Sequence, residues 1–404
     1  MSISDTRSTV HSDVLRQAVD VRQLAPAWRA LVSESDNDEP SVGPEWMGAW
    51  WEVFGGRGQK LHCLRVRAGD ELIGLAPFHS RTHWYRPGLP FRRLEMLGSG
   101  EPEADSICSD YPNLIARRGR EAEVVRAFID ALEQGKMGPW DELVIPLMDG
   151  TNPIPDLLVR AAHGRGWHGE CQETTRSYFI TLPETWEGYL RRLDKKARYL
   201  INRTNRDFEQ WADGQARFHR ATDEASLEEG KRVLRSLHLE RWEDANGGTF
   251  RSARFLAFHD RAMRALLAQG MLELIWLTVR GEPIAAMYDI RWGGKVSFYQ
   301  CGRRMDLPKQ IRPGGVLLYR AIEQAIESGM REFDFLGGEA IYKDQLATGS
   351  RPLVRVRIAR QGWLEHGRRI VSRVEDRLRQ IWRSRRAANP SARVEGDPNG
   401  GKTI

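Results

Sequence analysis

The sequence predicts an α/β protein built from two similar halves. Segments with strand and helix patterns alternate along the chain, which is typical of α/β folds. The stretch from Val279 to Ala286 echoes the stretch from Val66 to Ala76 with small gaps, so we expect an internal duplication with its join near residues 165–176. A chain of 404 residues with 41% hydrophobic content can bury a large core, and its length favours about two domains.

The first half is expected to alternate helices and strands after a polar, flexible lead at residues 1–20. Aromatic residues crowd the segment 43–55, so most of this helix belongs in a core. The turn Ala68-Gly69-Asp70 separates two β-rich runs and predicts a hairpin. The expected elements are helices at 24–32, 43–55 and 121–133 and strands at 61–67, 71–79, 92–97 and 142–146.

The second half begins near Ser177 with a strand and a long helix. Apolar residues recur at helical spacing, so we expect one helix from Pro183 to Trp211. Its other faces carry cations that either hold an anionic ligand or form a solvated basic face. These cations are Arg191, Arg192, Lys195, Lys196, Arg198, Arg203 and Arg206. The other expected elements are strands at 178–182, 272–279, 284–292 and 296–301 and helices at 225–241 and 253–269.

Residues 310–315 (QIRPGG) begin a further helix and suggest an anion-binding site. Pro313 suits a first helical turn because its ring presets φ and it has no amide proton to leave unpaired. The amides of Gly314, Gly315 and Val316 are expected to have no partner in their own helix, and the helix dipole favours negative charge there. A pyrophosphate fits this arrangement. The alternative is an ordinary surface helix that starts at a proline.

The C-terminal part predicts a half-exposed strand at 353–359 and a basic amphipathic helix at 364–386. Such a helix with a tryptophan lies on anionic lipid, docks on a protein partner, or packs on its own domain. Residues 387–404 are rich in Pro, Gly, Asn and Ser and are expected to be disordered.

Composition limits the class of protein. The net charge of +6 and pI near 9.2 favour anionic partners without requiring nucleic acid. The four cysteines lie far apart and the histidines show no triad or metal spacing, so we expect no metal and no Ser/His/Asp chemistry. The sequence has no signal-peptide pattern and no apolar run of membrane-spanning length. We expect a cytoplasmic protein that meets a membrane only at its surface.

Short motifs occur in a specific order and spacing in both halves. In the second half they are Gly281 to Ala286, Tyr299-x-x-Gly302-x-x-x-Asp306, Arg312 to Gly315, Ala325-x-x-x-Gly329, and Phe333 to Glu339 followed by Tyr342-Lys343. In the first half they are Trp50-Trp51-x-x-Phe54-Gly55, Gly74 to Pro77, and Ser109-Asp110-Tyr111. With these motifs, roughly residues 20–360 resemble the GNAT superfamily of acetyltransferases, in particular its bacterial cellulose-biosynthesis (CelD-like) branch, which is related to the FemAB aminoacyl transferases.

The resemblance implies two tandem GNAT-like units, each a mixed, mostly antiparallel sheet flanked by helices. The expected boundaries are 21–170 for the first unit, 171–362 for the second and 363–386 for the basic helix. An acyl donor, acetyl-CoA or another acyl-CoA, is expected in the second unit. Its binding residues would be Gln310, Arg312, Gly314, Gly315 and Val316. The chain departs from the superfamily at Pro313, within the phosphate loop, and at Leu346, where relatives often have an aromatic residue.

Acyl transfer from a thioester needs a positioned acceptor and a base for its proton, and an acid can help the thiolate leave. We expect Glu339 as the base, with Asp334 second, because both lie just past a strand end in a glycine-rich loop. Tyr299 and Tyr342 are the candidate acids. Each also has a structural interpretation: a strand-end hydrogen-bond acceptor for Asp334 and core aromatics for the tyrosines.

Lys343, Arg198 and Asp306 are the candidate acceptor-binding residues, although Lys343 can equally be solvated or pair with Glu339.

The sequence therefore predicts an acyl-CoA-dependent acyltransferase. The resemblance implies an acceptor that is a small molecule or glycan precursor, modified at an amine or hydroxyl during envelope or exopolysaccharide synthesis. No specific nucleic acid is expected as partner. One alternative is an aminoacyl-tRNA-dependent transferase whose basic helix around Arg191 to Arg206 binds RNA. The other is a noncatalytic scaffold of an envelope-synthesis complex, anchored by residues 364–386.

Overall fold

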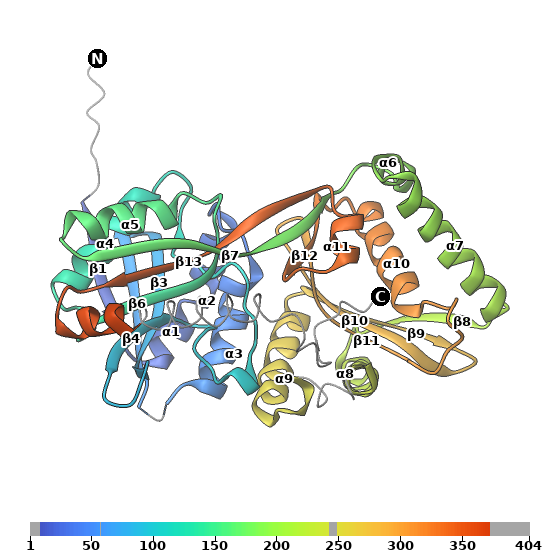
Figure 1. Cartoon of the computed structure of the whole chain (residues 1–404), viewed down its shortest axis with the longest axis horizontal. Helices are drawn as coiled ribbons and strands as arrows, with labels where there is room; N and C mark the ends of the chain where they lie inside the picture. The colour runs from blue at the N-terminus through green and yellow to red at the C-terminus, as the bar shows by residue number, and fades with distance from the viewer. Residues whose placement is uncertain (1–8, 57, 242–248, 372–404) are drawn as a thin grey trace, which may run out of the picture.

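A computed structural model describes residues 9–56, 58–241 and 249–371 (Figure 1). The strands form one continuous 13-stranded sheet in the order β1-β2-β3-β4-β6-β13-β7-β12-β11-β10-β9-β8, with β5 paired to β3. Helices cover both faces of this sheet. No helix of the described residues combines the length and the apolar character that crossing a membrane requires.

The two halves repeat one order of elements. In each, an edge strand and helices precede an antiparallel three-stranded meander, and a helix then leads to a strand parallel to the last meander strand. The first half comprises β1 (Val10–Leu15), α1 (Ala18–Gln23), α2 (Ala25–Ser33), α3 (Pro44–Phe54), β2 (Lys60–Ala68), β3 (Glu71–Trp84), β4 (Pro90–Met96), β5 (Ile115–Ala116), α4 (Glu121–Glu133), β6 (Glu142–Asp149) and α5 (Ile154–Gly164). The predicted duplication into two tandem GNAT-like units is therefore confirmed.

The second half follows the same order with two helices added in front of its edge strand. It comprises α6 (Trp186–Arg192), α7 (Lys195–Ala212), β8 (Ala216–Arg220), α8 (Glu224–Arg241), α9 (Ala253–Ala268), β9 (Leu272–Val279), β10 (Glu282–Trp292), β11 (Lys295–Arg303), α10 (Pro313–Glu327), β12 (Glu332–Gly337) and α11 (Ile341–Leu346). On one face of the sheet, α8 and α9 join the core of the first half. The other face carries a separate core beneath α7 and α10.

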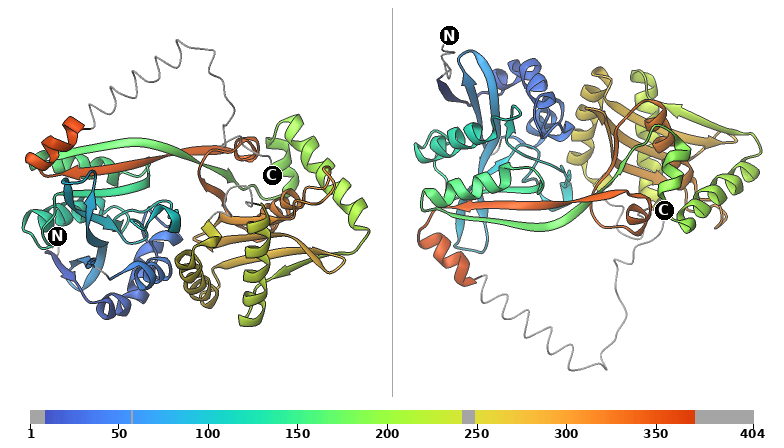
Figure 2. Two further views of the ribbon diagram at one scale, coloured as in Figure 1. Left: turned by 60° about the horizontal axis from the view of Figure 1, so that its bottom comes forward. Right: turned by 90° about the horizontal axis from the view of Figure 1, so that it is seen from above.

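Two long strands, β7 (His168–Thr181) and β13 (Gly349–Ala359), are exchanged between the halves. β7 ends the first half but pairs with β12 of the second, and β13 ends the second half but pairs with β6 of the first. The two strands also pair with each other along the whole of β13 (Figures 1 and 2). Each half therefore completes the sheet of the other. The predicted domain boundary at residues 170 and 171 falls inside β7 and stays a prediction.

Some elements differ from the sequence-based expectation. The single helix expected from Pro183 to Trp211 is broken, because Leu193 is extended and the Asp194 carboxylate caps the amide of Ala197 at 2.6 Å. The lead expected to be flexible is ordered from Val10, where β1 pairs with β2. The strand β8 and the helix α5 were not predicted. The predicted basic helix is helical at 363–371, and its remainder lies, like the tail at 387–404, outside the described residues.

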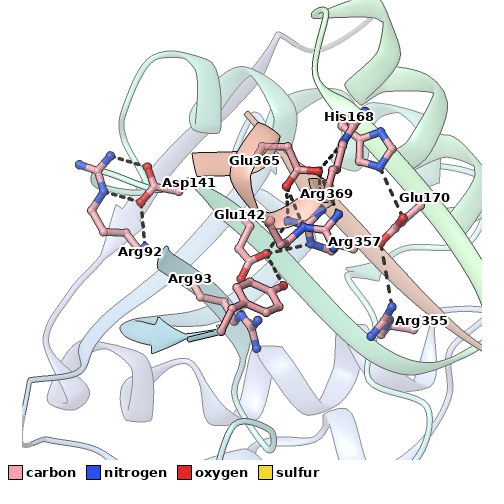
Figure 3. Close-up of polar contacts among 12 residues, drawn as sticks. Arg92, Arg93, Asp141, Glu142, His168, Glu170, Arg355, Arg357, Glu365 and Arg369 are labelled. Carbon is pink, nitrogen blue, oxygen red and sulfur yellow. Dashed lines mark hydrogen bonds and ion pairs between the residues drawn. The ribbon is translucent and has the colours of Figure 1, made fainter. Parts of the chain in front are cut away.

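A buried charge cluster holds β13 against the first half (Figure 3). The Glu142 side chain is fully buried and accepts hydrogen bonds from Arg93 at 2.6 Å, Arg357 at 2.8 Å and the Tyr85 hydroxyl at 2.8 Å. Arg357, on β13, also contacts Glu365 at 2.6 Å. The exchanged strand and the residues after it are therefore tied to β4 and β6 through one carboxylate.

We expect Glu142→Ala to lower the free energy of unfolding by about 2–4 kcal/mol, because a buried carboxylate that accepts three hydrogen bonds is lost. Arg93 and Arg357 then each keep one counter-charge, Glu95 and Glu365. The matched control is Glu170→Ala, whose carboxylate is 36% exposed and contacts His168 and Arg355 at 3.4 and 4.0 Å. Its loss is expected to cost less than about 1 kcal/mol. Urea denaturation of both variants measures the difference, and equal costs would show that the buried cluster does not hold the exchange.

Candidate active site

The candidate site lies where two parallel strands separate. β11 and β12 pair only at Lys295–Glu332, Val296–Phe333 and Ser297–Asp334, and then diverge. Because parallel strands run in the same direction, their carboxyl ends lie at the same edge of the sheet, and α10 starts just beyond β11. The opening between the strands and the start of α10 therefore belong to one region.

The first turn of α10 presents two free amides. Pro313 is the first helical residue, as predicted, and the amides of Gly314 and Gly315 have no hydrogen-bond partner among the described residues. The amide of Val316 was expected to be free too, but it donates to the Arg312 carbonyl oxygen at 3.1 Å. This is the first i to i−4 bond of the helix, so two amides rather than three are available to an anion.

Three arginines gather near this helix start. Burial, followed by the positive charges of Arg241 and Arg312, lowers the pKa of the Arg303 guanidinium. Arg241, the last residue of α8, also donates to the Cys301 thiol of β11 at 2.9 Å. Like charges this close repel each other, so a bound anion would stabilise the group. Of the three, only Arg312 was predicted from the sequence.

Of the two equivalent described helices, α4 and α10, only α10 of the second half has such an uncharged start. The equivalent helix of the first half, α4, has Glu121 and Glu123 in its first turn. The Glu121 carboxylate accepts the Gly119 amide at 2.9 Å, and Glu123 pairs with Arg120 at 2.7 Å. Their negative charges lie at the positive end of the helix dipole and make this helix start less favourable for an external anion. The duplicated units therefore differ at the position where a donor phosphate would bind.

A loop of the first half, residues 107–111, packs against the separating strands. The Ile107 carbonyl oxygen accepts the hydroxyl of Tyr299 at 2.5 Å, and the Tyr111 hydroxyl donates to Asp334 at 2.7 Å. The Asp110 carboxylate accepts the Gly337 amide at 2.9 Å. The candidate site is therefore built from both halves of the chain.

Asp334 lies at the junction of the two halves, where the loop 107–111 meets β12, and connects them. Its side chain is fully buried and accepts from the hydroxyls of Tyr111 at 2.7 Å and Ser177 at 2.8 Å. It also accepts the amide of Leu336 at 2.7 Å. Both carboxylate oxygens are thus engaged by the protein, which matches the structural interpretation of this residue.

Asp110 has the properties of a proton acceptor. Its carboxyl group is buried and borders a cavity of about 20 Å³ that Ser297 and Tyr299 also line. Burial, aided by the charge of Asp334, raises the pKa of Asp110 to about 6, although the Gly337 amide and Lys343 act in the opposite direction. A carboxylate with a pKa near neutrality can both accept and return a proton. Asp110 lies in the Ser109-Asp110-Tyr111 motif of the sequence, from which no role was predicted for it.

Lys343 supports the same junction. It is buried, and its Nζ donates to the carbonyl oxygens of Leu336 at 3.1 Å and Gly337 at 2.7 Å. Burial lowers the pKa of this ammonium group, and the nearby Asp110 and Asp334 partly oppose that shift. Lys343 thus lies with Asp110 and Asp334 rather than in solvent.

The candidate acids lie in different surroundings. The hydroxyl of Tyr299 is enclosed between the Ile107 carbonyl oxygen and His259 Nε2, which is 3.1 Å away. Tyr342 is partly buried beside Phe335 with ring centroids 6.1 Å apart, and burial raises the pKa of its hydroxyl.

The other predicted site residues lie nearer the surface. Glu339 and Gln310 are exposed, Arg198 is half-buried on α7, and Asp306 is exposed and paired with Arg304 at 2.5 Å. These positions do not establish a chemical role for any of the four residues, so the roles assigned to them stay predictions. Among the described residues, no group of three or more His, Cys, Asp or Glu side chains is arranged to hold a metal ion.

Comparison with known proteins agrees with this geometry. Residues 195–344 match the family described as "Acetyltransferase (GNAT) domain". No curated protein matches the chain. Among solved structures, FemX is 11% identical with a TM-score of 0.57 and covers 82% of this chain and 95% of its own.

A second similar structure is the C-terminal domain of a putative lysylphosphatidylglycerol synthetase from Agrobacterium fabrum, which is 10% identical with a TM-score of 0.51 and covers 86% of this chain and 93% of its own. At these identities the structures show a shared fold alone. The cellulose-biosynthesis branch is not distinguished by any of these matches. Residues 195–344 of the second half are thus similar to GNAT-type acetyltransferase domains, and the chain as a whole shares its fold with FemX.

Proposed function

We propose that this protein transfers an acyl group from acyl-CoA to an amine or hydroxyl of an envelope or exopolysaccharide precursor. The observation that carries the proposal is the anion site at the start of α10. There the free amides of Gly314 and Gly315 lie with Arg241, Arg303 and Arg312, beside the opening between β11 and β12. The pyrophosphate of CoA matches this combination of amides and guanidinium groups.

The reaction requires no nucleophile from the protein. The acceptor nitrogen or oxygen attacks the thioester carbonyl carbon, the resulting tetrahedral centre collapses, and the carbon–sulfur bond breaks to release the CoA thiolate. Binding both substrates side by side supplies much of the rate enhancement. We assign the removal of the acceptor proton to Asp110, because its carboxylate is buried at the junction, borders a cavity and has a raised pKa. The thiolate then takes up a proton.

A second function is favoured by the outer face of α7. Lys195, Lys196 and Arg203 are exposed there, and Tyr199 is 60% exposed among them. A basic face of this kind suits an RNA backbone, so an aminoacyl-tRNA donor is the alternative to acyl-CoA. If tRNA is the donor, tRNA binding should weaken steeply between about 50 and 200 mM salt while CoA shows no affinity.

CoA binding tests the proposed donor site. We expect CoA and acetyl-CoA to bind by isothermal titration calorimetry, and Arg312→Gln to weaken both about 10- to 100-fold through loss of one charge-assisted contact. Arg304→Gln is the matched control, since Arg304 is already paired with Asp306 in the same loop. An absence of CoA affinity in the native protein would contradict the proposal.

Substitution of Asp110 tests the assignment of the base. Asp110→Asn retains a carbonyl oxygen for the Gly337 amide but cannot accept the acceptor proton. We expect release of CoA thiol in the presence of a panel of amine and hydroxyl acceptors to fall by about 10²- to 10⁴-fold, with CoA affinity retained.

The pH dependence gives the same assignment an independent test. The base must be ionised, so the native rate should fall as the pH drops through about 6, and the variant should lack this acid limb. Glu339→Gln is the parallel variant. Full activity of Asp110→Asn together with a large loss in Glu339→Gln would transfer the role to Glu339.

A further inference from the structure

A groove of about 450 Å³ lies between α7, β8 and α10. Four aromatic side chains line it: Trp186, Phe208, Phe218 and Tyr319. Phe218 projects from the edge strand β8 and is 49% exposed. Rings that line a concave surface can stack on a planar ligand, and the volume is in the range of small-molecule sites.

The groove begins where the proposed donor site ends. Val316, which lines it, directly follows the free amide of Gly315, and Tyr319 is one turn further along α10. Thr204 of α7 lies 3.7 Å from the position that a Cβ on Gly315 would take, so α7 passes the helix start and continues along the groove. With a rise of about 1.5 Å per residue, the groove starts within about 6 Å of the anion site.

The polar groups of the groove favour a neutral, planar, amino-bearing ligand. Its one cation, Arg320, is paired with Glu323 at 2.7 Å. Glu209 and Asn205 add hydrogen-bond acceptors at the rim. A phosphate or carboxylate would meet these carboxylates, whereas an exocyclic amino group could donate to them.

A fatty acyl chain fits the position of this groove less well than a planar heterocyclic ring does. The acyl end of the donor must reach the opening between β11 and β12, where the candidate base lies. The groove instead adjoins the other side of the helix start, beyond Val316 and towards the edge strand β8. With the phosphates at Gly314 and Gly315, the two ends of the donor would extend in opposite directions.

We infer that this groove binds the adenine ring of the donor, stacked between the aromatic side chains and hydrogen-bonded through its amino group. The inference rests on the proposed acyl-CoA donor and adds the nucleoside site to it. It makes the groove a determinant of donor affinity and leaves the acyl-transfer chemistry to the junction of the two halves.

Calorimetric titrations with CoA and with 4′-phosphopantetheine, which lacks the nucleotide, test the inference in the full-length protein. We expect CoA to bind more tightly than 4′-phosphopantetheine. Phe218→Ala should weaken CoA about tenfold, in line with the loss of one stacking ring, and leave 4′-phosphopantetheine unchanged. Trp84→Ala is the matched control, because it removes an exposed ring from β3 of the first half.

The outcomes separate this inference from the proposed function. Equal affinity of the native protein for the two ligands would overturn the nucleoside site while leaving the donor site intact. The same conclusion follows if Phe218→Ala weakens both ligands equally. If neither ligand binds the native protein, the donor site itself fails, and the adenine groove fails with it.

Discussion

The reciprocal exchange of β7 and β13 is the constraint on which the rest of the structure depends. Each strand leaves its own half and pairs with the strand that closes the sheet of the other half. The pairing between β7 and β13 themselves then makes one sheet of two. Unlike a flat contact between domains, this arrangement cannot open without breaking main-chain hydrogen bonds on both sides. The buried Glu142 and Arg357 reinforce it at one end.

The exchange also explains why the duplicated units can differ in function. With the halves held in a fixed relation, a single donor site, proposed at the start of α10, can serve the whole chain. The first half has filled the start of α4 with Glu121 and Glu123, while the second half keeps an uncharged Pro-Gly-Gly start on α10. The first half contributes the loop with Asp110, which packs where β11 and β12 of the second half separate. The two copies have thus divided the site between them.

Local patterns in the sequence were sufficient for much of the fold. The hairpin turn at Gly69 and the helix start at Pro313 follow from the conformational preferences of Gly and Pro, and the structure has both of them. The break in the helix after Arg192 was missed because apolar periodicity continues through it, and only the side chain of Asp194 interrupts the helix. The spacing of apolar residues carries no information about such a capping side chain.

The junction residues could not be predicted for a different reason. Asp110 and Gly337 are 227 positions apart, and Arg241 and Cys301 are 60 apart, so no motif window contains both partners. Asp110 and Gly337 meet because the exchanged strands pair the two halves, and that exchange has no sequence signature of its own. Arg241 meets Cys301 because α8 packs on β11 within the second half. The predicted roles of Glu339 and Asp334 relied on closeness to a strand end within one unit, and that reasoning leaves out whatever the other unit supplies.

Backbone strain marks the same junction. Of the six described non-glycine residues with positive φ, four lie at the contact between the halves: Cys108, Tyr111, Leu147 and Leu336, with φ values of 49°, 62°, 51° and 59°. Such a conformation costs about 1–3 kcal/mol per residue and persists only where surrounding contacts impose it.

The contacts that impose it here are the ones that form the site. The Tyr111 hydroxyl donates to Asp334 of the other half at 2.7 Å, and the amide of Gly337, next to Leu336, donates to Asp110 at 2.9 Å. Residues between and beside these strained positions include Asp110 and Gly337. Relaxing the backbone would move the Asp110 carboxylate away from the opening between β11 and β12, so the energy that holds the strain comes from the paired halves. The position of the proposed base is therefore a property of the exchanged sheet as a whole, and neither half could supply it alone.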